Sequence, residues 1–127
     1  MNTILINGGY DTIDRVPCDE IITGEAGNDT ILGGTGDDSL AGGAGGDSLD
    51  DGDGNDKTTG GDGFDLFHGG VGNDRMYGQD GDDTIYGGPG NDSISANAGV
   101  DRTSGGTGED KIVGGDGNDL MHGNDNP

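Results

Sequence analysis

The sequence predicts an all-β protein built as a solenoid of two parallel sheets, with 18 residues in each coil. The main observation is a repeat: from Gly24 to His122 a nine-residue unit recurs eleven times without an insertion. Each unit has the form G-G-x-G-x-D-x-U-x, where U is a large apolar residue, and its residues are numbered as positions one to nine. A unit this short cannot bury an apolar face alone, so successive units must stack on one another.

Glycine dominates the first six positions of each unit. Position four is glycine in every unit except the one that contains Cys18, and the chain has 32 glycines in all. Glycine costs about 1 kcal/mol relative to alanine inside a helix, but it allows the positive φ angles that tight turns require. Positions one to six therefore predict a turn. The first two positions depart from glycine at Glu25, Asp51, Gln79, Ala96 and Asn97.

Positions seven to nine predict a very short strand, because they alternate outward, inward and outward. Two strands and two turns make one coil, so alternate units should build two facing sheets. One inward row is then Ile13, Ile31, Leu49, Phe67, Ile85, Thr103 and Met121, and the other is Ile4, Ile22, Leu40, Thr58, Met76, Ile94 and Ile112. A core one side chain thick does not offset the entropy lost when so many glycines are ordered. Something else must hold the chain together.

The frame of the repeat extends beyond the regular units. Ile6–Asp14 keeps glycine, aspartate and isoleucine at positions four, six and eight, and Arg15–Thr23 keeps Ile22. Thr3–Leu5 fits the end of a still earlier unit and predicts a first strand that covers the stack. We therefore expect a degenerate N-terminal coil or cap over residues 1–23, the regular solenoid over 24–122, and a C-terminal tail over 123–127.

The charge of the chain excludes several partners. It carries 26 acidic and five basic side chains, a net charge of -21, which would repel nucleic acid and anionic membranes. No stretch approaches the roughly 18 apolar residues of a spanning helix, and Met1–Ile6 lacks the basic start of a cleaved signal peptide. The lone Cys18 allows no intrachain disulfide. The composition alone also fits a flexible linker, but a linker does not enforce a strict period.

Position six carries an acidic residue in every unit. Those residues are Asp11, Asp29, Asp38, Asp47, Asp56, Asp65, Asp74, Asp83, Asp92, Asp101, Asp110 and Asp119, with Glu20 the exception to aspartate. Aspartates 18 residues apart lie on one edge in adjacent coils, about 4.8 Å apart, and repel each other unless a cation lies between them. Ca²⁺ is the natural candidate, since it takes carboxylate and carbonyl oxygens. The absence of a Cys/His cluster in the sequence argues against zinc, copper and iron.

The number of sites follows from the spacing. One edge has six gaps between Asp11 and Asp119, and the other has five between Glu20 and Asp110. The gaps bounded by Asp11 and Glu20 lack the double glycine, so nine remain of the eleven. Nine divalent ions bring +18 against a net charge of -21, which leaves the loaded chain near neutral. This favours filling with metal over a solvated acidic surface.

The repeat resembles the RTX, or haemolysin-type, calcium-binding nonapeptide repeat, as in Gly69–Tyr77, which reads GGVGNDRMY. The resemblance covers nearly the whole chain. It implies a right-handed parallel β-roll that is disordered without Ca²⁺ and folds on binding it. Proteins of this family are typically bacterial, leave the cell by type I secretion and fold outside it, usually beside a protease, lipase or pore-forming domain. The sequence contains no segment of the size of a catalytic domain beside the repeats, so we expect a secreted calcium-binding module without catalysis of its own.

Several other patterns are weaker. Asp51–Asn55 imitates the start of an EF-hand loop, but Asp56 and Asp62 replace the glycine and glutamate that such a loop requires, and no flanking helices are expected. His68 and His122 should lie three coils apart on an outward face, and Ser104 two coils from His68, so neither a shared metal nor a Ser/His/Asp triad is expected. The outward rows of threonine that could bind ice are interrupted by charged and bulky residues.

Two classes of function remain open. The chain is a folding switch or part of a larger secreted protein, or it is a self-standing extracellular structural or interaction protein, such as a surface-layer, adhesin or ice-binding-like protein. End-to-end self-association is possible in either class. The inward Thr58 and Thr103 are expected to loosen the core if their hydroxyls are unpaired, and replacing Thr58 with leucine would then lower the Ca²⁺ needed for folding.

Overall fold

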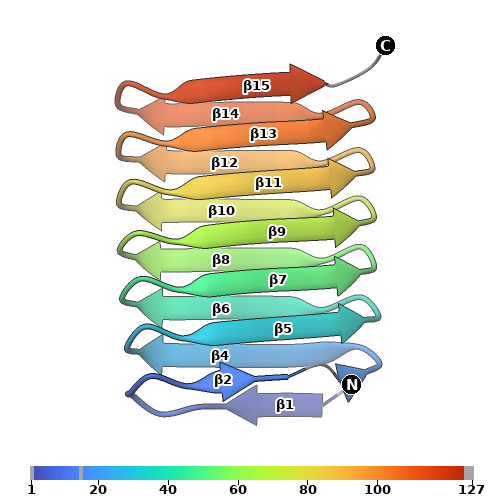
Figure 1. Ribbon diagram of the computed structural model, residues 1–127, viewed down its shortest axis with the longest axis vertical. Helices are drawn as coiled ribbons and strands as arrows, with labels where there is room; N and C mark the ends of the chain where they lie inside the picture. Colours follow the sequence, from blue (N-terminus) through green and yellow to red (C-terminus); the bar gives the residue numbers. More distant parts are fainter. Residues whose placement is uncertain (1, 15, 125–127) are drawn as a thin grey trace.

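The computed structural model describes residues 2–14 and 16–124, which form a stack of flat coils. Each regular coil contributes one strand to each of two sheets, and all the pairings are parallel (Figure 1). Paired residues differ by 18 in number, as in Ile31 beside Leu49. The predicted all-β, two-sheet solenoid with 18-residue coils is confirmed.

The two sheets divide the strands by alternate order along the chain. The first sheet has the order β1 (Asn2–Leu5), β4 (Glu20–Ala26), β6 (Ser39–Ala44), β8 (Lys57–Asp62), β10 (Arg75–Asp80), β12 (Ser93–Ala98) and β14 (Lys111–Asp116). The second has the order β15 (Leu120–Asn124), β13 (Arg102–Thr107), β11 (Thr84–Pro89), β9 (Leu66–Val71), β7 (Ser48–Asp53), β5 (Thr30–Thr35) and β2 (Thr12–Ile13), and β3 (Val16–Pro17) also pairs with β5.

The regular strands are longer than the sequence predicts. Three residues were expected from positions seven to nine, but β5 spans six, because pairing resumes at positions two and three of the next unit. Gly34, at position two, has φ of 111° and bends the strand without ending its pairing. The prediction of a six-residue turn is therefore wrong: only positions four to six lie outside the strands.

The inward rows pack as the repeat predicts. Ile31, Leu49, Phe67 and Ile85 are fully buried between the sheets, and the row of the first sheet runs in register from Ile4 to Ile112. Burial falls off at the C-terminal end of the described chain, where Met121 is 50 % exposed. The core is thus a single layer of side chains, in contact mainly with the coils above and below.

The N-terminal coil is less regular than the others. β1 pairs with β4 and covers the first sheet, as the sequence predicts. β2 and β3 replace one six-residue strand by two short pairings to β5. β15 ends at Asn124, so residues 125–127 of the predicted tail lie outside the described part of the chain. Over the described residues, no helix has the length and apolar character that crossing a membrane requires.

Candidate metal centre

The turns lie in two columns, one along each edge of the sheets (Figure 1). The acidic residues of position six stand at the ends of these turns, in two stacks. The first turn column contains the turns that lead from the first sheet to the second and end at Asp11, Asp29, Asp47, Asp65, Asp83, Asp101 and Asp119. The second turn column contains the return turns, which end at Glu20, Asp38, Asp56, Asp74, Asp92 and Asp110. The inner members are nearly inaccessible: Asp29 to Asp101 are at most 3 % exposed. Asp11, Asp110 and Asp119, near the ends, are partly exposed.

From Asp29 to Asp119, one carboxylate oxygen of each position-six aspartate links two coils. The backbone N–H of Asp38 donates to Oδ1 of Asp56 at 2.7 Å, and the same bond recurs between position-six residues 18 apart, from Asp11 and Asp29 at 3.0 Å to Asp101 and Asp119 at 3.1 Å. This bond fixes the rotation of the carboxylate. Its second oxygen is thereby held on the inner side of the turn.

That second oxygen has no partner. Oδ2 is buried and without a hydrogen bond in Asp29, Asp38, Asp47, Asp56, Asp65, Asp74, Asp83, Asp92 and Asp101. An unpaired ionised oxygen is among the most expensive groups to bury, and buried polar atoms in folded proteins nearly all find a partner. A row of orphaned carboxylate oxygens at every inner coil is the arrangement that bound cations would satisfy.

A backbone carbonyl oxygen of the next coil faces the same small space as Oδ2. A Cβ atom built on Gly33, at position one, would lie 2.7 Å from Oδ2 of Asp38 and 2.6 Å from the backbone carbonyl oxygen of Asp51 in the next coil. The two oxygens therefore converge above a glycine that leaves room for them. The same crowding by a carboxylate and a carbonyl of the next coil recurs at Gly24, Gly42, Gly60, Gly69, Gly78 and Gly87. We call each such space a cradle.

Backbone carbonyls supply further oxygens at each turn. A Cβ on Gly45, at position four, would collide with the carbonyl oxygen of Gly27 in the preceding coil, and one on Gly43, at position two, with that of Glu25. Stacked carbonyls of this kind and one or two carboxylates form a donor set made only of oxygen, which suits Ca²⁺. No group of three or more His, Cys, Asp or Glu side chains gathers among the described residues, so most ligands of a site here would come from the backbone.

Burial also changes how these acids titrate. Burial raises the pKa of Asp56 and of Asp65 to about 6, although the backbone N–H of the preceding aspartate opposes the shift. Burial raises the pKa of Asp74 and of Asp83 to about 7, against the same opposing bond. The raised values mean that the folded chain without metal resists full ionisation of its turns. A divalent cation paired with the carboxylates would remove that penalty.

Asp51 is a buried acid to which the sequence assigned no place in the core. It occupies position one, is 1 % exposed, and accepts a hydrogen bond on Oδ1 from the Thr58 hydroxyl. Burial raises its pKa to about 8. The hydroxyl of Thr58 is thus paired, and the expectation that it is an unpaired group that loosens the core is wrong. Oγ1 of Thr103, in contrast, is buried without a hydrogen-bond partner. The signal in the sequence was an acid at a position that is glycine or alanine in every other regular unit.

The residue before each aspartate distinguishes the two columns. In the second column, Oδ1 at position five accepts the backbone N–H at position five of the next coil, in an unbroken series through Asp19, Asp37, Asn55, Asn73, Asn91 and Glu109, at 2.7–3.1 Å. We call this series the Asx ladder. Among the described residues, the first column has two such bonds, from the N–H of Gly46 to Asn28 and from the N–H of Val100 to Asp82. Its other position-five residues include Tyr10 and Phe64, which are 84 % and 71 % exposed.

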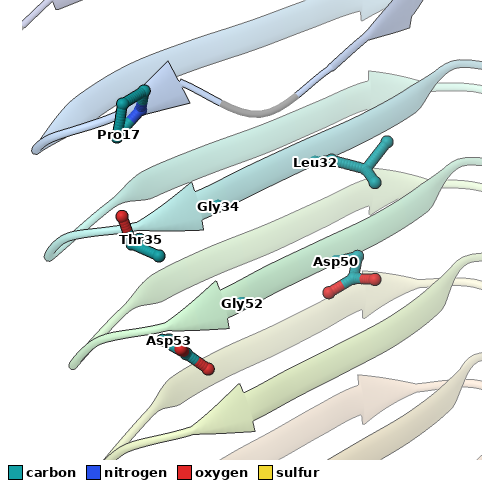
Figure 2. A pocket seen from close by; sticks show the side chains of 7 residues that line it. All are labelled: Pro17, Leu32, Gly34, Thr35, Asp50, Gly52 and Asp53. Carbon is teal, nitrogen blue, oxygen red and sulfur yellow. The ribbon is translucent and has the colours of Figure 1, made fainter.

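The outer faces hold no comparable arrangement of oxygens in the described chain. His68 stacks on Tyr86 with ring centroids 5.3 Å apart, and Tyr86 separates it in register from Ser104, as predicted. A pocket on the second sheet is lined by Pro17, Leu32, Gly34, Thr35, Asp50, Gly52 and Asp53, which Figure 2 shows. The stretch that imitates an EF-hand forms the end of β7, a turn and β8.

One comparison with known proteins gave a match. The family model described as the RTX calcium-binding nonapeptide repeat, in four copies, matches residues 19–49, 32–67, 50–85, 59–94, 68–103, 77–110 and 95–126, which together cover 19–126. Neither the comparison with curated proteins nor that with solved structures gave a match. The ion in the family's description, calcium, is the hard cation that the oxygen donor set of the turns fits.

Proposed function

Because the chain belongs to the RTX calcium-binding nonapeptide-repeat family, we propose that its position-six aspartates hold Ca²⁺ between adjacent coils of both turn columns. Six gaps in the first column and five in the second, less the two bounded by Asp11 and Glu20, give nine sites. The observation that supports this most strongly is the buried and unpartnered Oδ2 of every inner aspartate.

The cradles support the same assignment. Each brings Oδ2 of one aspartate and a carbonyl of the next coil to the same glycine, as at Gly33, so an ion there would contact both coils at once. Bound Ca²⁺ would supply positive charge between carboxylates that otherwise repel. The aspartate Oδ1 atoms, already bonded to the preceding coil, would keep their partners and orient the ligand oxygens.

We infer that binding and folding are coupled. The apolar core is one residue thick, and the acidic turns oppose compaction when no ion is present. A metal that binds only the folded chain stabilises it by mass action. The metal-free chain is then disordered, and the folded fraction rises steeply with Ca²⁺.

The biological setting is proposed from the family. Members are typical of secreted bacterial proteins, so we propose an extracellular module, exported by type I secretion, that folds where Ca²⁺ is plentiful. The module would itself catalyse no reaction and would serve as a folding switch within, or attached to, a larger secreted protein. A self-standing structural or adhesive protein, able to associate end to end, is the second candidate; β14 and β15 are the terminal strands of the two sheets among the described residues.

Calorimetry and circular dichroism test the proposal together. We expect about nine ions bound per chain, never more than eleven, and a strand signal that appears over the same range of Ca²⁺. Mg²⁺, which demands a tighter octahedral site, is the matched control and should not substitute. A full strand signal in metal-free buffer, or a stoichiometry of one or two ions, would contradict the proposal.

A further inference from the structure

One cradle differs from all the others because its glycine is replaced by an acid. Position one is buried in every unit from Gly24 to Gly114 and is glycine except at Asp51 and Ala96. Ala96 adds only a methyl group. Asp51 places a whole carboxyl group at the point where, in neighbouring units, a carboxylate and a carbonyl converge.

The Asp51 carboxyl is held by one oxygen and free at the other. Oδ1 accepts the hydroxyl hydrogen of Thr58, which reaches it from β8 on the opposite sheet. Oδ2 is buried and has no hydrogen-bond partner, and the side chain is 1 % exposed. Thr58 is itself fully buried between Leu40 and Met76 in register. The pair is therefore fixed inside the molecule, with one oxygen unsatisfied.

The unsatisfied oxygen belongs to the same unit as a position-six aspartate. Asp56 follows Asp51 by five residues, the separation that in other units puts position one beside Oδ2 of position six, as Gly33 lies beside Asp38. Oδ2 of Asp56 is also buried and unpartnered. Two orphaned carboxylate oxygens thus belong to this unit, whereas the units of Asp29, Asp38, Asp47, Asp65, Asp74, Asp83, Asp92 and Asp101 each have one such oxygen.

We propose that Asp51 Oδ2 is an additional ligand for the Ca²⁺ bound at the Asp56 turn, and that Thr58 is the positioning residue that aims it. The inference rests on the proposed function, since it assumes that the position-six turns bind Ca²⁺. The number and charge of ligands tune Ca²⁺ affinity over several orders of magnitude. An extra carboxylate makes this turn, near the middle of the stack, the tightest site, the first to fill and the last to empty.

The first part of the test measures Ca²⁺ affinity in the parent protein and three variants by titration against a chromophoric calcium chelator. Asp51→Asn keeps an acceptor for Thr58 but removes the charge, and we expect roughly a tenfold loss of affinity for the tightest ion. The double variant Asp51→Gly with Thr58→Val removes both side chains of the pair, so neither is left without its hydrogen-bond partner, and it restores the glycine of the other cradles. We expect the same loss of affinity for the tightest ion, even if this variant folds as well as the parent. Asp50→Asn, an identical charge change on the outward face, is the control and should leave the tightest ion unaffected.

Diffraction from crystals grown with Ca²⁺ separates this inference from the proposed function. We expect Oδ2 of Asp51 at 2.3–2.6 Å from an ion. Ions in the other cradles but not within reach of Asp51, together with unchanged affinity in Asp51→Asn, would overturn the inference and leave Asp51 as a protonated partner of Thr58. Turns without any ion would overturn the proposed function as well.

Discussion

The two turn columns carry the same aspartates but are held together differently. In the second column, the Asx ladder joins every turn to the next by a hydrogen bond that needs no metal, for example from Asn73 to Asn55 at 3.1 Å. In the first column, Gly46 and Phe64 interrupt the series, because neither side chain offers an oxygen. Under the proposed function, the first column therefore relies more on bound ions for cohesion between its turns, because the second column has a further series of hydrogen bonds that needs no metal.

Positions five and six form two separate series of hydrogen bonds between coils. Position-six bonds run from an amide in one coil to the carboxylate of the next coil, and position-five bonds run in the opposite direction. An edge with both series is tied in both directions, while an edge with only the position-six series is tied in one direction. On removal of Ca²⁺ we expect the first column to open before the second.

The largest expected effect comes from neutralising one aspartate in each column. Asp65→Asn and Asp74→Asn both keep an Oδ1 acceptor and lose the charge that attracts Ca²⁺. Loss of a charged partner is worth about 1.5–3 kcal/mol, so the Ca²⁺ concentration at half folding should rise roughly tenfold or more. The rise should be greater for Asp65→Asn, because Phe64 leaves that turn without a ladder bond.

Circular dichroism during a Ca²⁺ titration measures both midpoints. Asp80→Asn removes an equal charge from an exposed position and serves as the control. Equal shifts of the Ca²⁺ midpoint for the two variants would show that the two columns depend equally on Ca²⁺. No shift in either variant would count against the ligand role of position six.

Acidification without metal should act on both columns alike. Burial raises the pKa of Asp65 and Asp56 to about 6, and of Asp83 and Asp74 to about 7, against about 3.9 for an unfolded aspartate. The folded state then binds more protons than the unfolded one, so its stability falls as pH rises through 6–7 and is highest below about 4.

We therefore expect strand signal to increase when a metal-free sample is taken from about pH 8 to about pH 5, and Asp65→Asn to favour the fold in metal-free buffer although it weakens the fold in Ca²⁺. Circular dichroism in buffer passed over a chelating resin measures this. A strand signal that falls on acidification would contradict it.

A smaller effect is expected from cutting the Asx ladder. Asn73→Ala removes the acceptor for the Asn91 N–H and the side-chain bond to Asn55. These exposed bonds contribute about 0.5–1.5 kcal/mol each. Amide hydrogen exchange should show faster exchange in the second column of the loaded protein. Ser95→Ala, on the outer face of β12, is the control; protection that stays unchanged at Asn91 would show that the ladder contributes nothing.

The smallest effect is expected from extending the ladder into the first column. Phe64→Asn places an acceptor one coil below the N–H of Asp82 and removes a phenyl ring that is 71 % exposed. A single exposed bond should stabilise the fold by about 0.5 kcal/mol and lower the Ca²⁺ needed at half folding. Phe64→Ala separates loss of the ring from gain of the bond, and equal midpoints for the two variants would refute the contribution of the bond.

Much of this architecture could be predicted from the sequence because the repeat is strict. The 18-residue coil, the two inward rows and the two stacks of aspartates all follow from spacing alone, and Ile31 beside Leu49 shows the register. The strand length was wrong because paired glycines favour turns, whereas here Gly34 makes a corner and pairing continues after it.

Asp51 and the Asx ladder could not be read from the repeat. In an acidic chain one more aspartate is typical of the surface, and only the inward direction of position one shows that Asp51 is buried. The residues of the Asx ladder occupy position five, which varies from unit to unit. Their role depends on the direction in which the backbone N–H of position five in the next coil points.

Anomalous scattering from crystals grown with Ca²⁺ tests the central claim most directly. The account predicts calcium peaks between successive aspartates in both turn columns, with peaks on either side of Asp65 and of Asp74. Well-ordered coils without anomalous density between those aspartates would contradict it.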